Sequence, residues 1–145
     1  MVCSQNAPKR KGGVMSWDMW VTCFHKGELG RFPREIVERA FDGFTDRTEA
    51  DYWRLHGCHG TVSLGVEREI DSFAVNRPPG PDHPFWPALI KVLKQTSCVL
   101  YWPGDGSVVA NKSVIHHIPA TFDKAVGTPT VTTDLDEIME MIRKA

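Results

Sequence analysis

The sequence predicts an α+β domain in which a single antiparallel sheet of about five or six strands carries three helices, packed mainly on one face. Short runs rich in β-branched and aromatic residues, bounded by turn residues, predict the strands. Three longer segments repeat apolar residues at helical spacing instead. The sequence contains no internal repeat and no domain linker, which indicates one domain.

That domain is predicted to span residues 15–145, after a disordered basic tail at residues 1–14. The tail has three bases at residues 9–11 and no acid, and Met15 directly after it resembles an alternative start. Without those three bases the 17 basic residues of the chain fall to 14, against 18 acidic residues, a balance of −4. A mildly acidic domain argues against a nucleic-acid partner, because backbone binders present a surplus of Lys and Arg.

The first predicted strand covers residues 17–24 and has apolar side chains on both faces, as a central strand does. One face would carry Trp17, Met19, Val21 and Cys23, and the other Trp20, Thr22 and Phe24. After a turn, Phe32-Pro33 opens the first helix, because proline is tolerated where a helical N–H has no partner. The apolar positions of this helix are Ile36, Val37, Ala40, Phe41 and Phe44.

From Asp51 the pattern changes to short alternating runs, which predict a meander of two or three antiparallel strands ending near Asn76. The proline-rich connection at residues 77–84 excludes a central strand and leads into the second helix. That helix begins at either Pro84 or Pro87 and runs to about residue 96. Its buried stripe is Trp86, Leu89, Ile90 and Leu93.

A strongly apolar strand at residues 99–102 follows, and Asp105-Gly106 predicts a tight turn into a returning strand at residues 107–110. One more extended segment is predicted at residues 114–118. The third helix follows an N-cap at residues 133–134, with acids in its first turn and bases in its last.

Cysteine usage and hydropathy indicate a cytoplasmic protein. The four cysteines are widely spaced, without a CxxC motif, in a chain large enough to fold by apolar burial, so no disulfide framework is expected. No run approaches the roughly 18 consecutive apolar residues of a membrane span. The N-terminus lacks the apolar region of a secretory signal, so we expect neither export nor a membrane partner.

One short segment, His56-Gly57-Cys58-His59, has the residue types of a zinc site. A closed structural site needs four ligands, and the nearest further candidates are His116 and His117. Cys58 with a histidine also has the composition of a nucleophile and base, but no catalytic signature flanks it. The interpretation we favour is a glycine-rich turn with surface histidines, which requires no cofactor.

A binding patch is predicted where a strand passes into the proline-rich loop. Asn76 and Arg77 lie at that strand end, and Trp86 and Trp102 belong to the same strand-helix-strand unit. Together they would form an aromatic and cationic surface suited to a protein partner. In the alternative, Asn76 and Arg77 satisfy loop carbonyls and both tryptophans fill the core.

Four short motifs follow one another along the chain, Gly27-Glu28, Phe32-Pro33, Asn76-Arg77-Pro78 and Val99-Leu100-Tyr101-Trp102-Pro103. With these motifs and in the order of its elements from Ser16 to Ala145, the chain resembles small bacterial proteins found as immunity-type partners of polymorphic toxins. The resemblance implies a compact α+β module that binds another protein, for which a basic toxin domain would suit the acidic body. The hypothesis is therefore a non-enzymatic protein-binding module; the alternative is a small enzyme or zinc protein that uses the segment His56 to His59.

Overall fold

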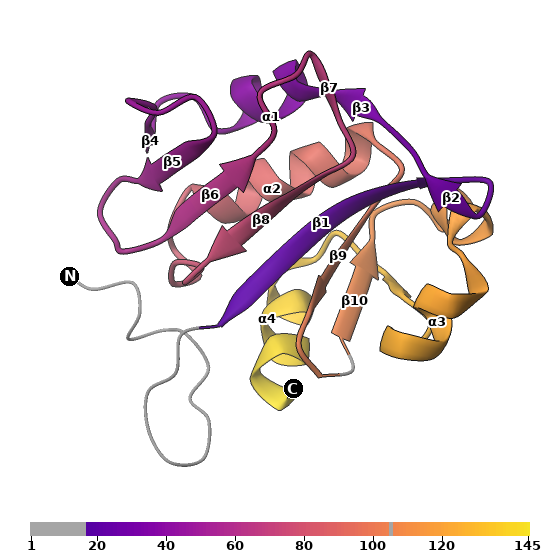
Figure 1. The fold of residues 1–145 in the computed structure, drawn as a ribbon. Coiled ribbons are helices and arrows are strands. Elements are labelled where there is room, and N and C mark those ends of the chain that lie inside the picture. Colours follow the sequence, from indigo (N-terminus) through magenta and orange to yellow (C-terminus); the bar gives the residue numbers. More distant parts are fainter. Residues whose placement is uncertain (1–16, 105) are drawn as a thin grey trace.

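One long strand, β1 (Asp18–His25), lies at the centre of the molecule (Figure 1). The computed structural model describes residues 17–104 and 106–145, and the predicted tail at residues 1–14 lies outside the described residues. Within them, β1 belongs to a nine-stranded sheet. β1 pairs with one strand on each side, at Asp18–Thr22 and at Trp20–Cys23, which confirms the prediction of a central strand.

The strands of the large sheet follow one another in a mixed order. From edge to edge it runs β4 (Thr45–Asp46), β5 (Tyr52–Leu55), β6 (Thr61–Leu64), β8 (Ser72–Asn76), β1, β9 (Cys98–Trp102), β10 (Gly106–Val109) and β11 (Thr130–Val131). Neighbours are antiparallel except β10 and β11, which are parallel. Off this path, β2 (Glu28–Leu29) pairs with β1, and β3 (Phe32–Pro33) pairs with β7 (Glu69–Ile70).

Three helices cover one face of the sheet. They are α1 (Arg34–Ala40), α2 (Phe85–Gln95) and α4 (Leu135–Lys144), and Figure 1 shows α2 and α4 behind the strands. Their apolar stripes pack on the inward residues of the strands in one large cluster that includes Met19, Val21, Phe73, Leu89 and Ile138. Burial of this apolar face is the main stabilising contribution to the fold.

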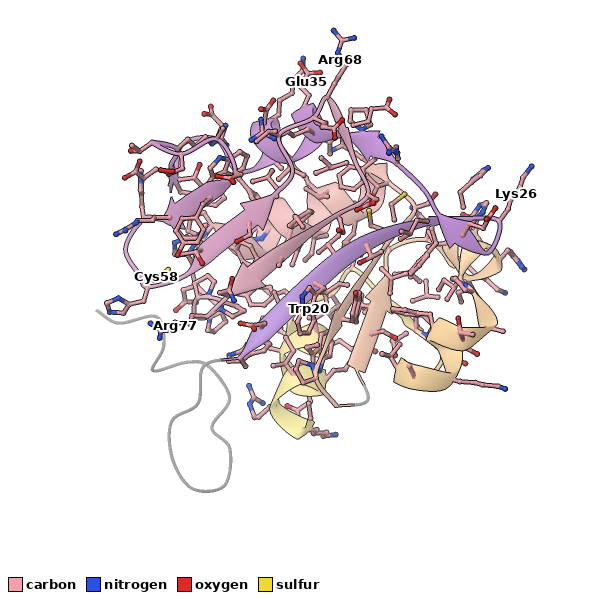
Figure 2. All side chains as sticks on the ribbon, in the orientation of Figure 1. Trp20, Lys26, Glu35, Cys58, Arg68 and Arg77 are labelled. Carbon is pink, nitrogen blue, oxygen red and sulfur yellow. The ribbon has the colours of Figure 1, made fainter. Side chains whose placement is uncertain are left out.

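The opposite face is covered only in part. A 3-10 helix, η2 (Lys112–His117), and α3 (Ala120–Val126) pack over β9, β10 and the end of β1. Phe24, Val99 and Val109 form a second, smaller cluster there with Val114, and Phe122 lies against it. Figure 2 labels Trp20 on β1, in the stretch of strand that precedes this covered region.

The structure confirms the α+β class with a large, mostly antiparallel sheet, but the predicted size was too small. The additional strands β2, β3, β4, β7 and β11 have two residues each, too short to show an alternating pattern. Within the described residues α3 contributes no fully buried side chain, so it lacks the apolar stripe that marks a helix in sequence. The segment predicted as extended at residues 114–118 forms η2 instead.

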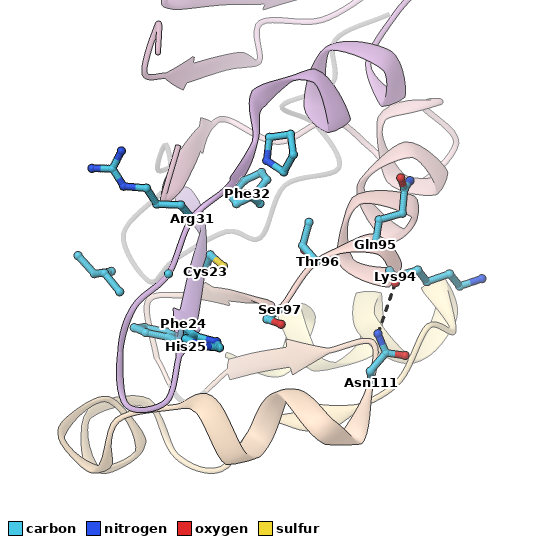
Figure 3. A pocket seen from close by; sticks show the side chains of 13 residues that line it. Cys23, Phe24, His25, Arg31, Phe32, Lys94, Gln95, Thr96, Ser97 and Asn111 are labelled. Carbon is cyan, nitrogen blue, oxygen red and sulfur yellow. Dashed lines mark hydrogen bonds between the residues drawn. The ribbon is translucent and has the colours of Figure 1, made fainter. Parts of the chain in front are cut away.

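A cavity of about 750 Å³ opens at the far end of β1 (Figure 3). It lies between the end of β1, the segment from β2 to β3 and the loop that follows α2.

Among the described residues, none of the helices has both the length and the apolar character that crossing a membrane requires.

Candidate functional site

Over β5, β6, β8 and the first half of β1, the second face of the sheet presents partly or fully exposed side chains in two cross-strand rows. The registers place Trp20, Ala74, Ser63 and Tyr52 opposite one another on four neighbouring strands. The next row along the strands is Asp18, Asn76, Thr61 and Arg54. We call these eight residues the open face.

Trp20 is held in place at the border between the open face and the covered region. Its ring stacks on Tyr101 with centroids 5.7 Å apart, and Tyr101 in turn packs edge-on against Phe122 of α3. The Tyr101 hydroxyl also shares a 3.1 Å hydrogen bond with the Thr22 hydroxyl. A half-buried indole fixed in this way can contact a partner at a low cost in conformational entropy.

The predicted residues Asn76 and Arg77 both lie at the surface. Asn76 belongs to the open face, where its side-chain amide donates a 2.7 Å hydrogen bond to Asp18. Arg77 is exposed, and its backbone has a φ of 50°, in the left-handed region. The Arg77 amide donates to the Trp17 carbonyl, so the backbone of this residue also shapes the strand end.

The two predicted tryptophans are core residues, and this corrects their assignment to a binding patch. Only 1% of Trp86 and 2% of Trp102 is exposed. The Trp86 indole donates to the carbonyls of Pro79 and Gly80, at 3.0 and 3.1 Å, and so anchors the proline-rich loop from inside. Neither ring is available to a partner, because large apolar rings gain most by burial and both belong to the main core cluster.

The segment from His56 to His59 forms a turn at one side of the molecule. His56 and His59 are exposed, Cys58 is half-buried, and the Gly60 amide donates to its sulfur. His117 lies elsewhere: its Nδ1 accepts from the Lys26 amide, and Figure 2 shows Lys26 and Cys58 at opposite sides. The described residues contain no group of three or more His, Cys, Asp or Glu placed to hold a metal ion.

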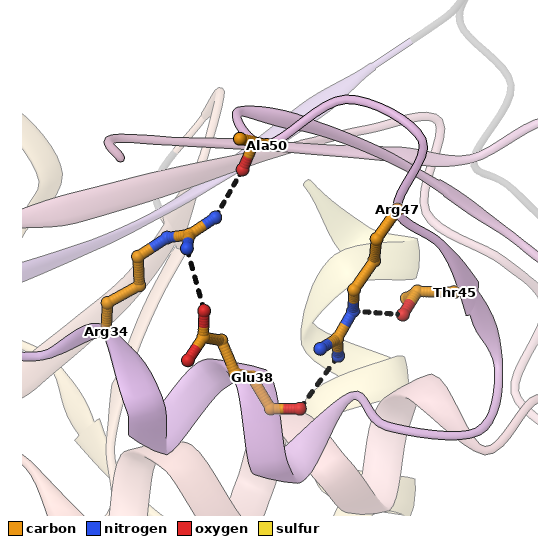
Figure 4. A network of polar contacts seen from close by, with 5 residues as sticks. All are labelled: Arg34, Glu38, Thr45, Arg47 and Ala50. Atoms are coloured by element: carbon orange, nitrogen blue, oxygen red, sulfur yellow. Dashed lines mark hydrogen bonds and ion pairs between the residues drawn. The ribbon is translucent and has the colours of Figure 1, made fainter. Parts of the chain in front are cut away.

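The loop between β4 and β5 borders the open face beyond β5. The guanidinium of Arg47 lies 4.1 Å from the centre of the Trp53 ring, and that of Arg34 lies 5.4 Å from it. Figure 4 shows that Arg47 also donates to the Glu38 carbonyl of α1 and to the Thr45 hydroxyl, while Arg34 joins Glu38 to the Ala50 carbonyl. This network attaches the loop between β4 and β5 to α1.

That loop is acidic where it faces solvent. Asp46, Glu49 and Asp51 are all exposed beside Tyr52, which is 42% exposed. Hydrogen bonds from the Thr48 hydroxyl and amide to one Asp46 oxygen lower the pKa of that carboxyl. A shallow hollow of about 380 Å³ lies among Asp46, Thr48, Glu49, Tyr52 and Arg54. The three exposed carboxylates of Asp46, Glu49 and Asp51 outnumber the exposed base Arg54, so this edge of the open face carries a surplus of negative charge.

Sequence reasoning placed Trp20 on one face of the first strand but did not identify it or Tyr52 as site residues. The alternation of the strands was the available signal, but it does not show which part of a face the helices leave uncovered. Comparison with known proteins finds no matching family model, no matching curated protein and no matching solved structure.

Proposed function

We propose that this chain is a non-enzymatic protein-binding module whose partner contacts the open face. The supporting observation is the pair of cross-strand rows, with Trp20 and Tyr52 at the two ends of a row across four neighbouring strands, on a sheet whose other face is covered by three helices. Tyr, Trp and Arg are enriched at protein interfaces, and the open face presents one of each.

The partner we propose has a basic surface. The acidic loop with Asp46, Glu49 and Asp51 borders the open face, and residues 15–145 carry a surplus of acidic residues. Complementary charge speeds association and selects against acidic partners. An immunity-type inhibitor of a bacterial toxin, acting in the cytoplasm, is the form of this function that agrees with the resemblance described above.

The first test concerns the neighbouring gene and the complex. An immunity-type inhibitor requires a toxin-like protein encoded directly upstream, and co-expression of the full chain should relieve the growth arrest that this protein causes. The two proteins should also purify as a complex. An upstream gene of another kind, or growth arrest that persists, would contradict the immunity-type function.

The second test locates the surface. Tyr52→Ala should weaken the complex by about tenfold or more, because an exposed aromatic side chain that a partner buries contributes strongly to affinity. Lys91→Ala, an exposed change on α2, is the matched control and should bind as the wild type does. Equal affinities for all three proteins would place the interface away from the open face.

A further inference from the structure

Two cysteines lie opposite each other beside the cavity at the end of β1. Cys23 of β1 and Cys98 of β9 are register partners and both are thiols. The Cys23 amide donates to the carbonyl of Asp71, the residue just before β8 on the other side of β1, so Cys23 and Cys98 face each other without backbone hydrogen bonds between them. Cα atoms of such pairs are about 4.5 Å apart, within the roughly 4.4–6.8 Å that a disulfide spans.

The two thiols differ in access and in acidity. Cys23 lines the cavity and is 4% exposed, whereas Cys98 is 0% exposed. A hydrogen bond from Cys98 lowers the pKa of Cys23, and burial raises the pKa of Cys98 well above its ordinary value. Since the thiolate is the reactive form, Cys23 is the group that reacts first with a reagent in the cavity.

A glycine keeps space beside the reactive sulfur. A Cβ atom at Gly30 would lie 3.1 Å from the Cys23 sulfur and 3.1 Å from the His25 Cβ, tighter than ordinary packing. The φ of Gly30 is not in the left-handed region, so space rather than backbone conformation accounts for glycine here. Figure 3 shows the Cys23 sulfur turned toward the hollow.

The cavity suits an anionic reagent. None of its lining residues is Asp or Glu; the charge of Asp71, outside the lining, opposes the lowering of the Cys23 pKa, and the hydrogen bond from Cys98 is the larger effect. The exposed bases Arg31 and Lys94 stand on opposite sides of its rim, with their side chains directed outward (Figure 3). Cations in this position attract a negatively charged molecule to the opening.

We propose that this cavity is a thiol modification site, at which Cys23 exchanges with a small disulfide that carries carboxylates and Cys98 then closes an intramolecular disulfide. First, the Cys23 thiolate bonds to one sulfur of the small disulfide, whose S–S bond breaks and releases one small thiolate. Second, the Cys98 thiol gives its proton to solvent, its sulfur bonds to the Cys23 sulfur, and the second small thiolate leaves. Two protein thiols are oxidised, and one disulfide is reduced to two thiols.

The test uses glutathione disulfide as the probe on the folded full chain with Cys3 and Cys58 changed to Ser. Peptide mapping without reductant should find Cys23 linked to Cys98. Cys98→Ser in the same background should stop at Cys23 bonded to glutathione, and Cys23→Ser should give neither product. A Cys98→Ser protein that accumulates no mixed disulfide at Cys23 would overturn the proposal.

A measurement on the wild type covers the case in which a Ser variant fails to fold. Under native conditions iodoacetamide should alkylate Cys23 at least about tenfold faster than Cys98, as access and thiolate character require. Equal rates for the two cysteines, or protection of both until the chain unfolds, would contradict the assigned order of reaction.

The charge of the reagent is tested separately. The double change Arg31→Gln with Lys94→Gln should slow the reaction with glutathione disulfide by about threefold at low salt. The reaction with uncharged hydroxyethyl disulfide should stay the same, and Lys91→Gln is the matched control. An equal loss of rate with both reagents would show that the rim bases do not select an anion.

Discussion

At the scale of single residues, the absence of a side chain at Gly106 in β10 leaves the space that the ring of Trp102 in β9 occupies. Gly106 is the register partner of Trp102, and a Cβ atom at Gly106 would lie only 2.0 Å from the Trp102 ring. The indole therefore lies flat where a side chain would otherwise stand. The sequence predicts Gly106 as half of a turn, because a glycine needed for close approach looks the same in sequence as one needed for a turn.

Gly106→Ala should destabilise the protein by about 3 kcal/mol or more, at the upper end of the cost of over-packing, since the ring must leave its place. Denaturant unfolding measures this. Adding Trp102→Leu to Gly106→Ala should cost less than the two single changes together, because the smaller side chain removes the overlap. Strict additivity would show that the two positions do not share one space.

Trp102 and Arg77 test the division between core and surface. Trp102→Ala should cost about 3 to 5 kcal/mol, the usual cost of truncating a large buried aromatic. Arg77→Ala should change the free energy of unfolding by less than about 1 kcal/mol, because the exposed side chain can be removed while the backbone amide still bonds to Trp17. If Arg77→Ala unfolds the protein, its side chain is a structural anchor and not a surface group.

At the scale of elements, apolar stripes in the sequence predicted the three helices that pack on the main core, α1, α2 and α4. The stripe of α2 placed Trp86, Leu89 and Leu93 inward, and all three are buried. The helix begins at Phe85, with Pro84 as its N-cap and Pro87 as its third residue, so neither of the two predicted first residues is the observed one, and the start lies one residue after Pro84. η2 was missed because its β-branched residues favour a strand locally, whereas their contacts with Phe24 and Val99 form only in the folded protein.

The turn between β4 and β5 gives a pH prediction. Hydrogen bonds from Thr48 lower the pKa of Asp46 in the folded state, so they stabilise the fold above the unfolded pKa of about 3.9 and lose effect as the pH falls through the folded pKa. Asp46→Asn should therefore reduce stability at about pH 7 and by less at about pH 3. Denaturant unfolding of the wild type and of Asp46→Asn at both pH values measures this loss of stability. In a Thr48→Val background, the loss caused by Asp46→Asn at about pH 7 should be smaller.

At the scale of the whole molecule, the candidate site depends on where coverage of the sheet stops. η2 and α3 lie over β9, β10 and the end of β1, and the rows from Trp20 to Tyr52 lie beside that cover. The sequence predicted helices on one face, and from that alone the other face would be uniformly open. The contact between Tyr101 and Phe122 marks the boundary between the covered and the open part of this face. That contact joins segments about twenty residues apart in the chain, so local sequence patterns do not predict it.

The charge distribution gives the last prediction. Because the acidic loop borders the open face, association with a basic partner should be fast at low salt and slow as salt rises and screens the charges. Glu49→Lys should lower the association rate and flatten its dependence on salt, with little change in dissociation, since an exposed charge acts mainly during encounter. Stopped-flow measurements at several salt concentrations separate the two rates, with Glu137→Lys on α4 as the matched control. The same loss from both variants would assign the effect to net charge, and a loss confined to Glu49→Lys would assign it to the loop beside Tyr52.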